Sequence, residues 1–247
     1  MKFVEIKGSD LRHSSFIRSE LSNSKIINKH LKNSYFYNSK LVDVIFEIPG
    51  DIFDNVFCLS DLKRIKFLGD KDDYNSSILN CDFRKSNLSG SEFCIESIAK
   101  SMFIKANLDG TVFYATEIAE CDFKGASCFM INLEDVDVRE CNFNWVDLSK
   151  MKVMKDISFV NSDLSYADLS TFDFQEKLFG LNKLFYTKLK NCNLKGIFMD
   201  DSELMFPDLE GARLEKAKFG KSQLAYIKFS QKQLNEIEIL EEGDGNV

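Results

Sequence analysis

Residues 81–140 read CDFRKSNLSGSEFCIESIAK, SMFIKANLDGTVFYATEIAE and CDFKGASCFMINLEDVDVRE, three blocks of twenty that align without a gap. Phenylalanine stands third in each block and again at Phe143. The residue two positions before it is Cys81, Ser101, Cys121 or Cys141. Five residues before each phenylalanine stands Ile or Val, and five residues after it stands Leu or Cys. Because the repeat of twenty is made of four steps of five, we expect a coil whose turns have four sides.

The shorter period of five extends far beyond this stretch. Apolar residues fall every fifth position from Ile6 to Phe46, from Ile78 to Val153 and from Phe159 to Ile239, and the residue two before each is mostly small. A step of five turns an α-helix by roughly 140°, which would spread these residues around the helix instead of along one face. In extended backbone, residues two apart point the same way, so the apolar residue and its small neighbour both face inward. Each side is therefore predicted to be one short strand-like segment.

The period slips at a few places, and these predict loops. The apolar positions are 11 residues apart from Phe46 to Phe57 and from Phe67 to Ile78, and 6 apart from Val153 to Phe159. Each step is a multiple of five plus one, as a one-residue bulge would give. We expect outward loops near 47–56, near 68–77 and near 172–182; in the last, large or polar residues replace the small inward ones.

Composition predicts one domain. Residues 1–240 are expected to form a single domain of about eleven stacked coils, and 241–247 an acidic flexible tail. No apolar run reaches the roughly 18 residues of a membrane span, and the first residues lack a signal core, so we expect no membrane contact and a cytoplasmic location. Inward cysteines suit a reducing compartment. The net charge of −7 gives no basic footprint for direct nucleic-acid binding.

The repeating triplets resemble those of the pentapeptide-repeat proteins. The motif of that family is roughly Ala, then Asp or Asn, then Leu, followed by two variable residues. Matches run over about residues 4–240 and are clearest at Ala106-Asn107-Leu108, Ala167-Asp168-Leu169, Ser86-Asn87-Leu88, Cys192-Asn193-Leu194 and Cys81-Asp82-Phe83. The resemblance implies an all-β fold, a right-handed quadrilateral parallel β-helix with one pentapeptide on each side.

The sequence offers little for catalysis, and we expect a protein that is not an enzyme and has no cofactor. His13 and His30 are expected to face solvent and have no metal-ligand spacing with a cysteine, so no metal site is expected. Four acids fall at corresponding positions of one side and form a candidate acidic surface: Asp82, Asp122, Asp163 and Glu203. Residues of other types interrupt the series, and Asp or Asn at this position can bond to the local backbone, which favours a structural role.

Outward-facing aromatic residues are the stronger candidate site. The five-residue period assigns one side of the coil to a set of apolar residues, and in five successive coils an aromatic residue follows that apolar residue by two positions. These aromatic residues are Trp145, Tyr166, Tyr186, Phe206 and Tyr226, and Phe185 and Met205 flank them. An exposed apolar strip of this kind is typical of a protein interface. The alternative is that the rings stack on one another to shield the coil edges. Base stacking of single-stranded nucleic acid ranks third, because cationic neighbours are few.

These features predict a non-catalytic binding or scaffold protein that acts through the outside of a rod. What the resemblance implies is more specific: members of the family mimic B-form DNA in shape and charge, dimerise through their C-terminal coils and bind type II topoisomerases such as DNA gyrase. The acidic balance and the apolar strip fit such a homodimer and such a partner, whereas the many outward lysines do not fit a uniformly anionic surface.

A bacterial effector, or a fragment of one, is the alternative function. Pentapeptide repeats also occur in proteins that are secreted into host cells and bind host proteins there. Such effectors carry further segments before or after the repeats, and the coils predicted here occupy almost the whole of the sequence.

Overall fold

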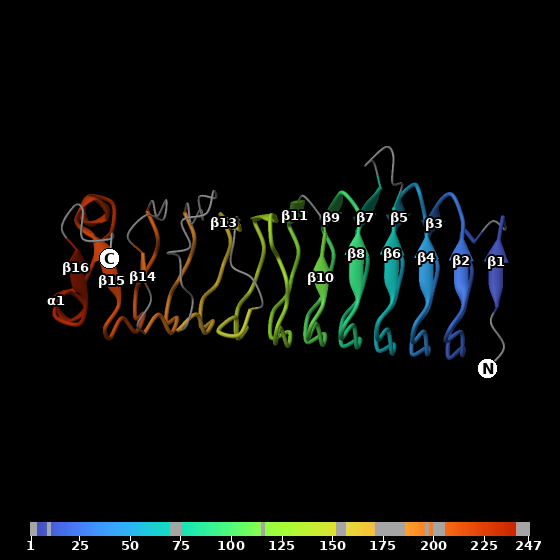
Figure 1. The fold of residues 1–247 in the computed structure, drawn as a ribbon, viewed down its shortest axis with the longest axis horizontal. Coiled ribbons are helices and arrows are strands. Elements are labelled where there is room, and N and C mark those ends of the chain that lie inside the picture. Colours follow the sequence, from blue (N-terminus) through green and yellow to red (C-terminus); the bar gives the residue numbers. More distant parts are fainter. Residues whose placement is uncertain are drawn as a thin grey trace.

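The computed structural model describes residues 4–8, 11–69, 76–114, 117–151, 157–170, 186–195, 198–199 and 206–240. Within them the chain winds into a rod of about ten turns, with strand β1 (Glu5–Lys7) at one end and strand β16 (Glu238–Leu240) at the other (Figure 1). All the strand pairs are parallel. The predicted four-sided parallel β-helix is thus confirmed.

The strands form three sheets that run along the rod. The first sheet holds β1, β2 (Lys25–Ile27), β4 (Ile45–Glu47), β6 (Lys66–Leu68), β8 (Glu92–Cys94) and β10 (Val112–Phe113). The second holds β3 (Leu31–Lys32), β5 (Ile52–Phe53), β7 (Ser77–Leu79), β9 (Ser97–Ala99), β11 (Glu117–Ala119), β12 (Asp137–Arg139) and β13 (Ser158–Val160). The third holds β14 (Phe198–Met199), β15 (Lys218–Gly220) and β16.

These sheets and two series of single β-bridges define the four sides of each turn. The first sheet forms the first side, to which the third sheet also belongs because β15 follows the fourth-side residue Arg213, and the second sheet forms the second side. The third side is the bridge series from Ser15 through Asp82 and Asp122 to Asp208. The fourth side is a parallel series that includes Glu20, Asn87 and Asn107. We number each corner after the side that precedes it, so the third corner joins the third side to the fourth.

Many of the corners contain one residue with a positive φ. In the turn that begins at Phe103, the N–H of Ala106 donates to the carbonyl of Phe103 at 2.9 Å, and Lys105 between them has a φ of 57°. This is the pattern of a type II turn, which places its third residue at positive φ. The same geometry recurs at Lys85, Trp145 and Tyr166, each two residues after an inward residue of the third side. Each of these corner residues therefore follows an inward residue by two positions.

Two stacks of phenylalanine fill the middle of the rod. On the third side, rings from Phe16 to Phe143 stack one per turn at centroid distances of 4.6 to 4.9 Å. On the first side, rings from Phe46 to Phe113 stack at 4.8 to 5.2 Å. The two stacks meet edge to face, as Phe36 does with Phe46 at 5.8 Å and 88°. Both arrangements are favourable for aromatic quadrupoles, so the stacks close the interior without a gap for water.

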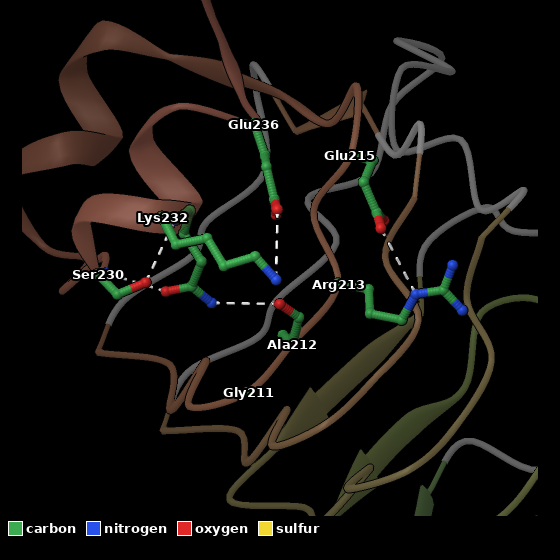
Figure 2. A pocket seen from close by; sticks show the side chains of 8 residues that line it. Gly211, Ala212, Arg213, Glu215, Ser230, Lys232 and Glu236 are labelled. Carbon is green, nitrogen blue, oxygen red and sulfur yellow. Dashed lines mark hydrogen bonds and ion pairs between the residues drawn. The ribbon is translucent and has the colours of Figure 1, made fainter.

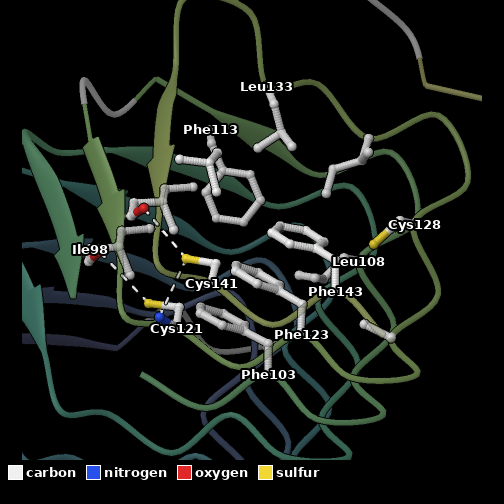
Figure 3. Packing of buried hydrophobic residues seen from close by; sticks show 14 of the residues in the cluster. Ile98, Phe103, Leu108, Phe113, Cys121, Phe123, Cys128, Leu133, Cys141 and Phe143 are labelled. Atoms are coloured by element: carbon white, nitrogen blue, oxygen red, sulfur yellow. Dashed lines mark hydrogen bonds between the residues drawn. The ribbon is translucent and has the colours of Figure 1, made fainter. Parts of the chain in front are cut away.

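The small inward residues lie beside the phenylalanine stack and bond to the backbone (Figure 3). Cys121 and Cys141 occupy neighbouring turns, and the N–H of Cys121 points to Sγ of Cys141 at 3.4 Å. Cysteine and serine at this kind of position both donate to a carbonyl of the previous turn, as Cys141 Sγ does to Ile118 at 3.4 Å and Ser91 Oγ to Leu62 at 2.9 Å. These groups are buried, so their polar atoms need such partners.

The turns do not all have the same length. Most pairs are twenty residues apart, but Leu31 pairs with Ile52 at 21 and Ile52 pairs with Ile78 at 26. Asp163 bridges to Lys188 at 25, and Asp168 bridges to Asn193 at the same step. The extra five residues of this turn therefore lie after Asp168 and before Lys188.

The structure describes one of the three segments expected to form loops in full, one in part and one not at all. Residues 47–56 take up one additional residue at a turn around Pro49 and Gly50, and then form β5, whose Ile52 is buried at 1% exposure. The five-residue period skips Ile52, because that residue sits one position out of phase. Of the other two expected loops, residues 70–75 and 171–185 lie outside the described residues, as does the acidic tail.

The last turn departs from the predicted pattern. A 3-10 helix η1 (Lys221–Ala225) and a short helix α1 (Gln231–Leu234) replace two of its sides. Leu234 and Ile239, predicted to face inward, are 40% and 43% exposed, so this part of the prediction was wrong. Gln233 points inward instead, and its Nε2 donates to the carbonyls of Leu209 at 2.9 Å and Ala212 at 3.3 Å. In regular turns a small inward side chain donates to the carbonyl of an inward apolar residue in the preceding turn, as Ser91 does to Leu62, and here the longer amide of Gln233 makes that bond.

Among the described residues, no helix combines the length and the apolar character needed to cross a bilayer.

Candidate interaction surfaces

Buried side chains fill the middle of the rod in the part that the structure describes. The phenylalanines of both stacks, from Phe36 to Phe143, are at most 1% exposed. The thiols beside them are also buried. Burial raises the pKa of Cys81 and that of Cys192 to about 12, and it also raises the pKa of Cys121. Since the thiolate is the reactive form, these cysteines are held in their inert state.

The two histidines are exposed, as predicted. His30 Nδ1 accepts the N–H of Asp51 at 3.3 Å, and neither histidine belongs to a group of potential metal ligands among the described residues.

The candidate acidic residues Asp82, Asp122 and Asp163 share the third side, as predicted. Met102 and Asn142 lie between them, so no two of these carboxylates occupy adjacent turns. Glu203 lies outside the described residues. The sequence pattern placed Glu203 on the same side as Asp163. Because the turn after Asp163 is five residues longer, the bridge series instead passes from Asp163 to Lys188 and Asp208.

Each of these carboxylates has a structural partner. Asp122 Oδ1 accepts the N–H of Lys124 at 2.9 Å, and Asp163 accepts that of Ser165 at 3.0 Å. Asp82 is engaged on both oxygens by the guanidinium of Arg84, at 2.9 and 2.7 Å. Partial burial works to raise the pKa of Asp163, but the hydrogen bonds from Ser165 and the charge of Lys188 outweigh it, so the pKa lies below its ordinary value. The predicted backbone bonding of this position is confirmed.

Charged side chains elsewhere on the exterior are largely paired between turns. Lys25 lies 2.5 Å from Glu47, Lys66 lies 2.8 Å from Glu92, and Arg64 is 2.7 Å from Asp43. Similar pairs join Lys190 to Glu210 and Lys218 to Glu238. The outside is therefore a mosaic of both signs, not a uniformly negative surface.

The outward aromatic residues lie at two corners, not on one strip. Trp145 and Tyr166 lie at the third corner, and their rings stack at 4.3 Å and 2°. Tyr186 and Phe206 stand two residues before the bridge residues Lys188 and Asp208, which places them at the second corner. Phe206 stacks on Tyr186 at 5.6 Å and meets Tyr226 edge to face at 6.2 Å. Phe185 and Met205 lie outside the described residues.

All five aromatic residues are exposed, between 47% and 63%. Trp145 stacks on Tyr166 and Tyr186 stacks on Phe206, so each of these four rings already has one face covered by a neighbour. A ring with one face covered can take part in fewer stacking contacts with successive bases.

Two hollows flank the C-terminal turn. A groove of about 530 Å³ lies between the turn at Phe206–Gly211 and the chain at Tyr226–Gln233, with Leu209 and Phe229 in its lining. A smaller pocket of about 120 Å³ opens beside α1, where Lys232 pairs with Glu236 at 3.6 Å and Arg213 with Glu215 at 3.7 Å (Figure 2). The charges of the small pocket are matched, whereas the large groove combines aromatic and apolar walls. The groove is a feature that the linear pattern did not indicate, because it depends on the irregular last turn.

A solenoid of four-sided turns built from five-residue units defines a class of repeat protein. The profile of the pentapeptide repeats matches eight copies over residues 183–220, and the periodicity extends far beyond that stretch. Residues 183–220 carry the repeats of this family, and the described part of the chain has the four-sided turns that such repeats build.

Solved structures of similar proteins include HetL, a pentapeptide-repeat protein involved in heterocyst differentiation regulation in the cyanobacterium Nostoc. It is 14% identical, with 87% of this chain and 88% of HetL covered and a TM-score of 0.36. Full-length QnrB1, a plasmid-mediated fluoroquinolone resistance protein, is 17% identical, with 91% and 95% covered and a TM-score of 0.24. A trypsin-treated QnrB1 variant gives 19% identity, 87% and 92% coverage and a TM-score of 0.27. Likeness at this level says nothing about function. No curated protein sequence matches the chain.

Proposed function

We infer that this protein is a non-catalytic binding protein that works through the outside of its rod. The observation that carries the inference is the closed interior: inward side chains fill the space between the four sides, and five of the exposed aromatic residues lie at two corners. A rigid exterior with exposed rings among paired charges is typical of a protein interface. The seven cysteines are free, which supports a cytoplasmic location.

A type II topoisomerase such as DNA gyrase is the partner that we propose to test first. About ten turns at roughly 4.8 Å each give a rod about 50 Å long, comparable to a short stretch of duplex, and the net charge is −7. The ion pairs between turns reduce the negative field. We therefore expect binding to depend on shape and on local contacts more than on long-range attraction.

The test is gyrase supercoiling of relaxed plasmid, with and without a quinolone. Folded protein at micromolar concentration is expected to inhibit supercoiling or to restore it in the presence of the drug. The control is Phe123→Asp, which keeps every outward residue of the sequence but, as argued below, loses the fold that displays them. Unchanged supercoiling in both conditions would remove gyrase as the partner.

The second corner is proposed as the surface of a homodimer formed by the C-terminal coils. Tyr186, Phe206 and Tyr226 are exposed side by side, and the groove lined by Phe206, Tyr226 and Phe229 lies next to them. A second copy brings the same rings to the same groove about a twofold axis, which is the geometry of an isologous contact.

Light scattering at micromolar concentration tests this surface. The wild-type protein is expected to be a dimer, and Tyr186→Ser combined with Phe206→Ser a monomer. Trp145→Ser with Tyr166→Ser removes an equally exposed stacked pair from the other corner and is expected to leave the dimer intact. A monomeric wild type would refute self-association, and loss of the dimer in both double variants would refute its assignment to the second corner.

A further inference from the structure

Between Lys85 and Tyr166, the third corner carries a ladder of side chains with one rung missing. In successive turns it presents Lys85, Lys105, Gly125, Trp145 and Tyr166. Hydrogen bonds fix the order: the N–H of Lys105 donates to the carbonyl of Lys124 at 3.1 Å, and that of Gly125 to Asn144 at 2.9 Å. Gly125 has a φ of 63°, close to those of its neighbours, but it has no side chain to occupy its rung.

The space at this rung is open. A Cβ placed on Gly125 would have only Cγ of Lys105 within 4 Å, at 3.8 Å, apart from adjoining residues. On the far side stands Trp145, 60% exposed, and Tyr166 covers one face of its indole. The other indole face is directed along the rod toward Gly125. Turns are about 4.8 Å apart, so a ring held at the empty rung would lie within stacking distance of Trp145.

The side of the slot opposite Trp145 is cationic. Within the described residues, Lys85, Lys105 and Lys124 form no ion pair, in contrast to the lysines paired between turns elsewhere. Nearby carboxylates are occupied: Asp122 accepts the N–H of Lys124, and Asp109 accepts the hydroxyl of Ser127 and the N–H of Phe129. A ring in the slot would have the indole on one face and the Lys105 side chain near the other, an arrangement that favours stacking together with a cation–π contact.

We propose that this slot binds an aromatic side chain of a partner protein, in a segment where acidic residues flank that aromatic residue. The ring takes the place of the missing rung, and the flanking carboxylates pair with the three free lysines. A nucleic-acid strand fits less well, because the slot is one ring deep and a net charge of −7 repels a long polyanion. The proposal rests on the exterior being the binding surface, but it involves neither gyrase nor the second corner.

Trp145 is the only tryptophan of the chain, so its fluorescence reports on the slot alone. The probe is a blocked peptide, Asp-Asp-Phe-Asp-Asp, titrated into the full chain with calorimetry in parallel. We expect a saturable blue shift of the emission, because the peptide ring covers an indole face now in water. Replacing Phe by Ala, or the four Asp by Lys, in the peptide is expected to weaken binding at least tenfold.

Gly125→Phe fills the rung and is expected to abolish the peptide response. The corner tolerates side chains at this φ, since Trp145 and Tyr166 adopt 65° and 64°. The matched control is Gly110→Phe, at a φ of 65° on the fourth corner, which should leave peptide binding unchanged. Lys85→Ala with Lys105→Ala keeps the slot open and is expected to weaken binding at least tenfold, which covers the case in which the filled variant misfolds.

Three results would overturn the proposal: no saturable shift with the acidic peptide, undiminished binding by folded Gly125→Phe or by the double lysine variant, or a response to oligothymidylate with none to the peptide. Because the readout is the tryptophan itself, failure here leaves the supercoiling and light-scattering results as they stand.

Discussion

The phenylalanine stack of the third side and the aromatic pair at the third corner have similar stacking geometry but differ in their exposure to solvent. Phe123 stacks on Phe143 at 4.6 Å, and Trp145, two residues further on, stacks on Tyr166 at 4.3 Å. The phenylalanines are almost wholly buried, whereas Trp145 and Tyr166 are about half exposed. Two residues along the chain thus separate a stack that closes the interior from one that is exposed to solvent. Position relative to the corner, not residue type, decides between the two roles.

The largest effect is expected from a charge placed in the inner stack. Phe123→Asp removes a buried ring and leaves a carboxylate without a partner, which should cost more than about 4 kcal/mol and unfold the neighbouring turns. Phe123→Leu is the control, because leucine holds the same position at Leu164 and Leu189 and should cost much less. Thermal melting followed by circular dichroism measures both. An unchanged melting temperature for Phe123→Asp would show that the ring is not interior.

A pH titration tests how dry the inner small-residue position is. Burial raises the pKa of Cys81 from 9.0 to about 12, so the unfolded chain loses this thiol proton near pH 9 while the folded chain keeps it. The free energy of unfolding should be at its full value below pH 9 and fall as the pH rises towards 12, by up to about 1.4 kcal/mol per pH unit for a single thiol.

Chemical denaturation across this range measures the slope. Cys81→Ser should reduce it, and serine already occupies the equivalent position at Ser101. Cys58→Ser, at a half-buried outward cysteine, should change it less. Equal slopes for wild type and Cys81→Ser would mean that water reaches this thiol.

The outer stack should contribute little to stability. Removing the ring in Tyr166→Ala is expected to cost about 0.5–1 kcal/mol, since half of each ring stays in water in either state. A double-mutant cycle with Trp145→Ala isolates the stacking energy from the effect on the corner backbone. A coupling as large as that between two inner phenylalanines would contradict the division of roles described here.

The smallest effect is expected at the surface ion pairs. Arg64 holds Asp43 through two hydrogen bonds of 2.7 Å, but both side chains are exposed. Arg64→Ala should leave the melting temperature within experimental error, and any difference should shrink as salt is added. A pronounced, salt-independent loss would show that these pairs belong with the core.

The inner residues were predictable because facing inward is a local property. An apolar residue with a small residue two before it signals an inward pair anywhere in the chain, and Phe83, Phe103, Phe123 and Phe143 are all found inside. The prediction failed where regular turns end or shift. Ile52 was missed beside a one-residue insertion, and Leu234 and Ile239 are exposed because the last turn is rebuilt by short helices.

The grouping of surface residues was less predictable, because it depends on everything that precedes them. One extra residue breaks the period and is visible in the sequence. Five extra residues between Asp168 and Lys188 keep the period intact, so the sequence pattern continues as if nothing had changed. Every later residue nevertheless moves to another side, which is why Trp145 and Tyr186 occupy different corners.

The same five-residue addition gives the rod a way to diversify. Gaining or losing one pentapeptide rotates the whole downstream exterior by a quarter of a turn about the long axis, while each inward residue keeps an equivalent place in the core. Two recognition patches on one rod can in this way be re-aimed relative to each other in discrete steps, at little cost to folding. Duplication of a short segment then offers evolution, or an engineer, new combinations of patches without redesigning either one.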